Sequence, residues 1–96
     1  MGDITLPTRY TELAIYERRI VREKYIELQG GNCYYCGESL NEKAPKRITD
    51  KKIRWDKFPK NFLQYPIHLQ HNHDTDLTEG AVHNYCNAMM WQYENK

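Results

Sequence analysis

The sequence has no apolar run near the roughly 18 residues that a transmembrane helix needs. Its first residues lack the basic and apolar regions of a secretory signal peptide. It also has no internal repeat and no low-complexity segment. These absences argue against a membrane protein, a secreted protein and a repeat protein, and they predict a cytoplasmic protein. Cysteine is scarce as well: there are three, and an odd number argues against a framework of disulfide bonds.

The chain is short, and its length limits how it can be stabilised. Ninety-six residues predict a single domain over residues 1–96. A chain of this size buries only about two thirds of its unfolded surface, so its hydrophobic core contributes little stability. Small domains often compensate with a disulfide, a bound metal or a partner. The disulfide framework is already disfavoured, which directs attention to metal ligands.

The first half of the chain contains one strong helical pattern. Apolar residues recur at spacings of three and four between residues 11 and 29, which predicts an amphipathic helix there. Thr11 is the expected N-cap, and Gly30 and Gly31 supply the stop signal. Arginines in this segment are interspersed with glutamates, which favours a solvated face over a phosphate contact.

The C-terminal third, residues 65–94, predicts two strands followed by a helix. Tyr65 to His71 alternates in the manner of a strand with Ile67 and Leu69 facing inward. Residues 74–80 are turn-like, and Ala81 and Val82 end the second strand. Residues from 83 onward favour helix.

Two further structural predictions concern single segments. Met89, Met90 and Trp91 are expected to pack in the core of the last helix. The alternation around residues 53–55 allows a short strand.

Four residues have the types and spacing of a zinc site. Cys33 and Cys36 form a Cys-x2-Cys knuckle followed by a glycine, and His83 and Cys86 form a His-x2-Cys pair. A tetrahedral zinc takes four such ligands, so this assignment uses all three cysteines. The two pairs are separated by 46 residues, and all four ligands come from the protein, which predicts a structural ion. The alternative, a thioredoxin-like redox pair, lacks the surrounding βαβ pattern.

The charge is concentrated in a basic insert over residues 43–60. It holds eight basic residues against two acidic ones, a net charge of +6 in a chain whose formal net charge is +1. Such density favours contact with a phosphate backbone, and aromatic residues inside it could stack on bases. The predicted DNA contacts are Lys51, Lys52, Arg54, Trp55 and Lys57. The alternative is a solvated basic loop with its aromatic residues in the core.

A histidine cluster follows the basic insert. His68, His71 and His73 lie within six residues, beside Asp74. Because zinc is already assigned four other ligands, this cluster favours a second metal or acid–base role. Asn87 follows the last zinc ligand and could offer an amide oxygen to a divalent ion.

Together these motifs resemble the HNH endonuclease superfamily, and most closely its recombination endonuclease VII branch. The matching motifs, in chain order, are Cys33-x2-Cys36, Gln-His-Asn-His-Asp at 70–74, Gly-Ala-Val-His at 80–83, Cys86 and Asn87-Ala88. The resemblance covers roughly residues 29–91. It implies a small zinc-stabilised α+β domain of the ββα-metal (His-Me finger) type, here with an N-terminal helix.

The resemblance also implies roles for the matching positions. His71 matches the general base, which takes a proton from the water that attacks phosphorus. His73 matches the second histidine of the motif, near the metal or the scissile phosphate. Asn87 matches a ligand of a catalytic Mg²⁺ or Mn²⁺.

One position departs from the family pattern. Gln70 stands where the family normally has an Asp or His ligand of the catalytic cation. A neutral amide oxygen binds Mg²⁺ more weakly than a carboxylate does. His68 and Asp74 are the candidates to replace it as a ligand.

The expected function is a metal-dependent DNA endonuclease, encoded by a phage or prophage and acting in the bacterial cytoplasm. It would nick DNA or cut both strands. Cutting both strands usually takes two paired active sites, so a homodimer stays open as an oligomeric state. Two other functions stay open. One is a weakened or silent HNH-like zinc module that binds nucleic acid or a protein partner. The other is a zinc-stabilised domain of unrelated purpose.

Overall fold

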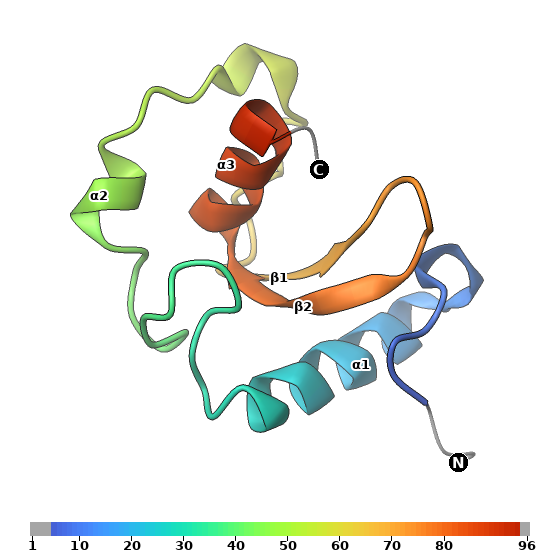
Figure 1. The fold of residues 1–96 in the computed structure, drawn as a ribbon. Helices are drawn as coiled ribbons and strands as arrows, with labels where there is room; N and C mark the ends of the chain where they lie inside the picture. Colours follow the sequence, from blue (N-terminus) through green and yellow to red (C-terminus); the bar gives the residue numbers. More distant parts are fainter. Residues whose placement is uncertain (1–4, 95–96) are drawn as a thin grey trace.

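A hairpin of two strands lies between two helices in this protein. The structure, a computed structural model, describes residues 5–94. Helix α1 (Ile15–Leu28) packs on one side of the antiparallel strands β1 (Ile67–His71) and β2 (Thr78–His83), and α3 (Asn84–Glu94) packs on the other (Figure 1). A short helix, α2 (Lys46–Thr49), lies in the connection between α1 and β1. The predicted small α+β fold is therefore confirmed.

Helix α1 begins four residues later than predicted. Its N-cap is Ala14, whose N–H donates to the Glu17 carboxylate at 2.8 Å. Thr11, the predicted N-cap, lies in a separate 3-10 turn (Tyr10–Glu12), and its N–H and hydroxyl both donate to the Asp76 carboxylate. This contact ties the 3-10 segment to the β1–β2 turn.

The predicted end of α1 is confirmed. Gly30 and Gly31 both adopt positive φ, which glycine tolerates without steric cost. Their N–H groups donate to the carbonyls of Glu27 and Ile26, at 3.1 and 2.8 Å, and so close the helix with a Schellman motif.

Strand β1 starts at Ile67, two residues later than predicted. Pro66 has no N–H to give to a strand ladder. Its carbonyl instead accepts the Asn84 N–H at 2.9 Å, which ties the start of β1 to the start of α3. The register shifts between Gln70 and His71, so the ladder is irregular within the histidine cluster.

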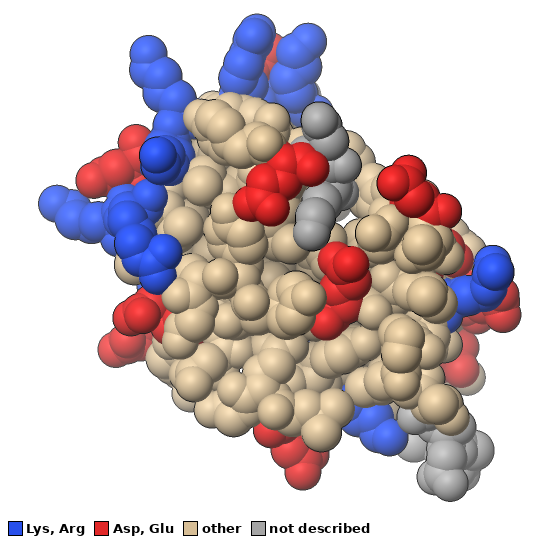
Figure 2. Space-filling model, in the orientation of Figure 1, with Lys and Arg blue, Asp and Glu red and all other residues tan. Residues whose placement is uncertain are grey.

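The basic insert contains no strand, so the strand predicted around residues 53–55 is wrong. Trp55–Lys57 form a 3-10 turn. The neighbouring backbone is held by α3, because the Gln92 amide accepts from Arg54 N–H at 2.7 Å and donates to the Lys52 carbonyl at 2.8 Å. The Gln92 side chain thus makes the hydrogen bonds to this backbone that a neighbouring strand would otherwise make. All eight basic side chains of the insert are exposed, and Figure 2 shows cations gathered over the upper left, where Figure 1 places this segment.

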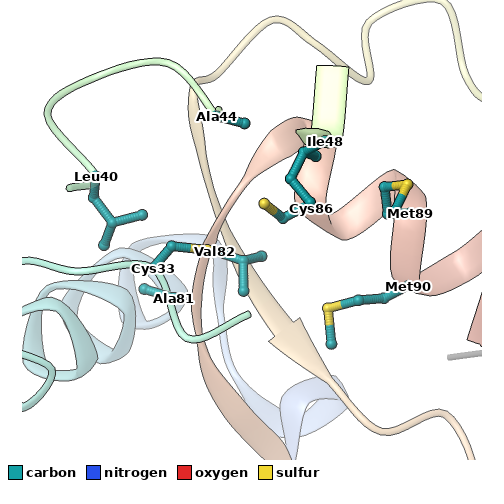
Figure 3. Packing of buried hydrophobic residues seen from close by; sticks show 9 residues of the cluster. All are labelled: Cys33, Leu40, Ala44, Ile48, Ala81, Val82, Cys86, Met89 and Met90. Carbon is teal, nitrogen blue, oxygen red and sulfur yellow. The ribbon is translucent and has the colours of Figure 1, made fainter. Parts of the chain in front are cut away.

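The main core lies between β2, α3 and the cysteine knuckle. Met89 and Met90 are buried in it, as predicted, but Trp91 is 48% exposed, so its predicted core position is wrong. A smaller cluster joins α1 to β1. Figure 3 shows the nine buried residues of the main cluster: Cys33, Leu40, Ala44, Ile48, Ala81, Val82, Cys86, Met89 and Met90. Because two of the nine are cysteines of the predicted metal site, that site and the core are one structural unit.

Candidate metal centre and adjacent histidine cleft

The four predicted zinc ligands converge. The ligand atoms of Cys33, Cys36, His83 and Cys86 all lie within 4.8 Å of one another. The Cys36 and Cys86 sulfurs lie 3.4 and 3.7 Å from His83 Nδ1. In a tetrahedral zinc site, where Zn–S bonds are about 2.3 Å and Zn–N bonds about 2.0 Å long, neighbouring ligand atoms stand about 3.5–3.8 Å apart. The cluster is therefore positioned to hold a metal ion.

The imidazole of His83 is oriented for ligation. Its Nε2 lies 2.9 Å from the Ser39 carbonyl and donates a hydrogen bond to it. Nδ1 is then the deprotonated nitrogen and faces the cysteines. Metal-bound histidines commonly use their second nitrogen in this way, which fixes the tautomer and the ring orientation.

Local backbone geometry brings the two ligand pairs together. In the knuckle, Tyr35 N–H donates to Cys33 Sγ at 3.4 Å, and Gly37 turns the chain at a φ of 81°. The knuckle docks on β2, because Tyr34 N–H donates to the Ala81 carbonyl at 2.9 Å. His83 ends β2 and Cys86 lies in the first turn of α3. The four-residue cluster therefore lies at the junction between strand β2 and helix α3.

The thiol groups of the cluster hold their protons unequally. A hydrogen bond from Cys86 lowers the pKa of Cys33 to about 4. The same contact, together with burial, raises the pKa of Cys86. Burial raises the pKa of Cys36. A divalent cation would displace the protons that remain, so metal binding here is coupled to proton release.

A cleft of about 420 Å³ contains the residues predicted for catalysis. Strand β1 and the turn after it line the cleft with the histidine cluster, α3 with Asn87 and Trp91, and α1 with Arg18 and Arg22. Asn87 directly follows Cys86, so it is one residue along the chain from the candidate metal site. The predicted site residues that line the cleft are Gln70, His71, His73 and Asn87.

His71 is held by ring stacking. Its imidazole lies parallel to the Tyr10 ring, with centroids 3.9 Å apart and planes 3° apart, and His73 lies 4.6 Å away. The Arg18 guanidinium covers Tyr10 at 4.1 Å. Within residues 5–94, neither His71 ring nitrogen has a hydrogen-bond partner. Burial, and then the nearby His73, lower the pKa of His71, which favours the neutral ring that can accept a proton.

His68 orients the amide of Asn87. The Asn87 amide nitrogen lies 3.0 Å from His68 Nδ1 and donates to it, which turns the amide oxygen away from the histidine. Burial lowers the pKa of His68, in keeping with a neutral acceptor ring. His68 therefore positions the side chain whose oxygen was predicted to bind a cation.

Gln70 is buried at the cleft and only half satisfied. It is 2% exposed, and its Nε2 donates to the carbonyl of His71 at 3.0 Å. Its Oε1 is buried without a hydrogen-bond partner. Buried polar atoms normally have partners, so this oxygen is available to a ligand.

The cleft contains no second cluster of the zinc type. Among the described residues, the Cys3His group is the one set of three or more His, Cys, Asp or Glu ligands close enough to share an ion. No carboxylate from residues 5–94 lines the cleft. Asp74, the suggested replacement for Gln70, is exposed in the β1–β2 turn and is not among the lining residues.

The predicted DNA contacts divide into two kinds. Lys51, Lys52, Arg54 and Lys57 are exposed cations. Trp55 is also 37% exposed, and it contacts other rings, with centroids 5.3 Å from Tyr85 and 5.6 Å from Phe58, so its DNA contact stays a prediction.

The residues of the cleft that were not predicted include two arginines and a tyrosine that contact or face the histidine cluster. Arg18 and Arg22 were interpreted as part of a solvated face, yet their i, i+4 spacing puts both on one side of α1, toward the cleft. Tyr10 gave no signal beyond being aromatic.

Comparison of the chain with family models, curated proteins and solved structures found no match. None of the helices in residues 5–94 has the length and apolar character needed to cross a membrane.

Proposed function

We propose that this protein is a metal-dependent DNA endonuclease of the HNH type. One observation carries the proposal: a neutral histidine with unpartnered ring nitrogens, His71, shares a cleft with the Asn87 amide and two arginines. The metal centre beside the cleft fixes the helix that carries Asn87. This combination of a base, an oxygen ligand and cations is what hydrolysis of a phosphodiester requires.

The chain's own residues would act as follows. Arg18 and Arg22 would hold the phosphate by charge. His71 would take a proton from water as the water oxygen bonds to phosphorus, and the bond to the 3′ oxygen would break. Asn87 and Gln70 would hold the catalytic cation through their amide oxygens, and the bound Mg²⁺ or Mn²⁺ would supply charge stabilisation of the leaving oxygen. The exposed lysines of the basic insert would contact the DNA backbone without reading its sequence.

The first test is cleavage of supercoiled plasmid. We expect nicking that requires added Mg²⁺ or Mn²⁺ and is absent in buffer freed of divalent cations. The control omits the cation and adds no chelator, because a chelator would also strip the structural site. Zinc content and circular dichroism establish that the protein is folded. Folded, metal-loaded protein that never cuts under either cation would contradict the nuclease proposal.

A second candidate function is a silent module that binds nucleic acid without cutting it. The observation that favours it is the absence of any carboxylate from the described lining of the cleft. Neutral ligands alone bind a hard cation weakly. Retained DNA binding without cleavage would support this alternative.

Replacing Gln70 by aspartate should separate these two functions. The Gln70 oxygen has no partner within residues 5–94, so a carboxylate there gains a cation without breaking an existing bond to that atom. We expect Gln70→Asp to raise the nicking rate at limiting Mg²⁺ on the order of tenfold, because ligand charge strengthens binding of hard cations. Gln70→Asn is the matched control, since it has the same length as aspartate and no charge. Equal rates for the two variants would show that Gln70 is not a ligand.

A further inference from the structure

A second groove, of about 430 Å³, shares a wall with the histidine cleft. Phe62 and Trp91 line both, and Phe58 lines the second groove alone. Two cations of the basic insert, Arg54 and Lys57, also line it. The groove thus contains three aromatic side chains, is bordered by positive charge, and adjoins the residues proposed to cut a phosphodiester.

The aromatic rings of the groove contact one another in tilted, not stacked, arrangements. Phe58 and Phe62 are tilted by 60° with centroids 4.8 Å apart, and Phe58 and Trp91 lie 6.4 Å apart at 63°. Tilted and edge-to-face contacts are preferred geometries for neighbouring aromatic rings. Trp91 is 48% exposed, although the two residues before it are buried. The groove therefore offers aromatic surface to a flat ligand.

The groove is held in shape before any ligand arrives. Gln92 bonds the backbone at both Lys52 and Arg54, and the Tyr93 hydroxyl donates to the Lys52 carbonyl at 2.6 Å. These contacts hold the backbone of residues 52–54, which leads into the groove, against α3. A preformed site does not have to order its walls on binding, which favours affinity.

We propose that this groove binds an unstacked nucleobase of a single-stranded or locally opened DNA strand, whose adjoining phosphate lies in the histidine cleft. Aromatic faces bind bases of any sequence, and cations at the rim complement the strand's negative charge. A base and its phosphate are one sugar apart, and the two clefts share the Trp91 wall. In an intact duplex the base faces are already stacked, so duplex DNA does not fill the groove. The inference rests on the proposed function, because it specifies which form of DNA strand the proposed nuclease would bind.

The test is the affinity for a fluorescently labelled twelve-residue oligothymidylate, compared with a hairpin duplex of the same label, by anisotropy without divalent cations. We expect Phe58→Leu and Trp91→Leu each to weaken single-strand binding by about tenfold or more, since base stacking on one ring is worth that much. Duplex binding should change less than twofold. Tyr16→Leu is the matched control, because Tyr16 is an exposed aromatic residue of α1 that lines neither cleft.

The two substitutions keep the test decisive. Phe58 is half-buried, so Phe58→Leu is checked for folding; Trp91 is half-exposed, so Trp91→Leu tests the groove independently. Single-strand affinities of both variants equal to that of Tyr16→Leu would overturn the inference, even for a protein that nicks plasmid. Ring-dependent single-strand binding by a protein that never nicks would uphold the groove and remove only the nuclease activity.

Discussion

Replacing Cys86 by serine is expected to abolish metal binding and unfold the protein. Cys86 is a member of the metal cluster and also a fully buried member of the main core. A structural zinc in a small domain contributes about 10–16 kcal/mol of apparent binding free energy. A domain's total stability is about 5–15 kcal/mol, so loss of the ion removes most or all of it. The hydrophobic core of this short chain is too small to compensate.

The measurement combines metal content with thermal unfolding followed by circular dichroism. Wild-type protein should contain one zinc per chain and unfold cooperatively, and a chelator should reproduce the Cys86→Ser result until zinc is added back. Met89→Leu is the matched control, because it changes a buried neighbour on α3 at similar volume and should cost less than about 1.5 kcal/mol. A zinc-free Cys86→Ser protein that unfolds at the wild-type temperature would overturn the assignment.

The metal cluster could be predicted from sequence because its ligands are paired locally. Cys33 and Cys36 share one turn, and His83 and Cys86 share another, so each pair is recognisable by spacing alone. Because a structural zinc takes four ligands, the two pairs could be assigned to one ion although 46 residues separate them. The orientation of His83 could not be predicted, because it depends on a backbone carbonyl, that of Ser39, that carries no sequence signature.

The start of α1 could not be predicted for a different reason. Thr11 is a good N-cap by residue type, and local propensity supports it. In the folded chain its donors are taken by Asp76, which lies 65 residues away. A contact at that separation is set by how α1 docks on the hairpin, which periodicity does not describe.

The α1 side of the cleft was missed for the same kind of reason. Helical periodicity shows that Arg18 and Arg22 share a face, but it does not show whether that face meets solvent or a neighbouring strand. Trp91 is the reverse case, since its residue type favours burial while its position leaves it 48% exposed. In both cases the observed position differs from the predicted one at a residue that lines a cleft. Departures from local sequence rules are expected at such sites.

Replacing His71 by alanine is expected to reduce plasmid nicking by about 10²–10⁴-fold while leaving zinc content and the fold unchanged. General-base catalysis by a positioned side chain contributes that range. Burial already lowers the pKa of His71, and a cation bound nearby would lower it further, so the ring is neutral at pH 7 and able to accept a proton. The side chain is half-buried and belongs to neither buried core cluster, so its removal should not unfold the protein.

Imidazole added to the His71→Ala protein distinguishes proton transfer from a structural role. Removing the ring leaves a space beside Tyr10, where the His71 centroid lay 3.9 Å away. If His71 carries the proton, free imidazole should partly restore nicking of the variant and leave the wild-type rate unchanged. If the ring only supports Tyr10 and the N-terminal turn, the variant should lose thermal stability together with activity, and imidazole should restore neither. Nicking by His71→Ala at the wild-type rate would show that the cleft uses another base, and His73, 4.6 Å away, would be the next residue to replace.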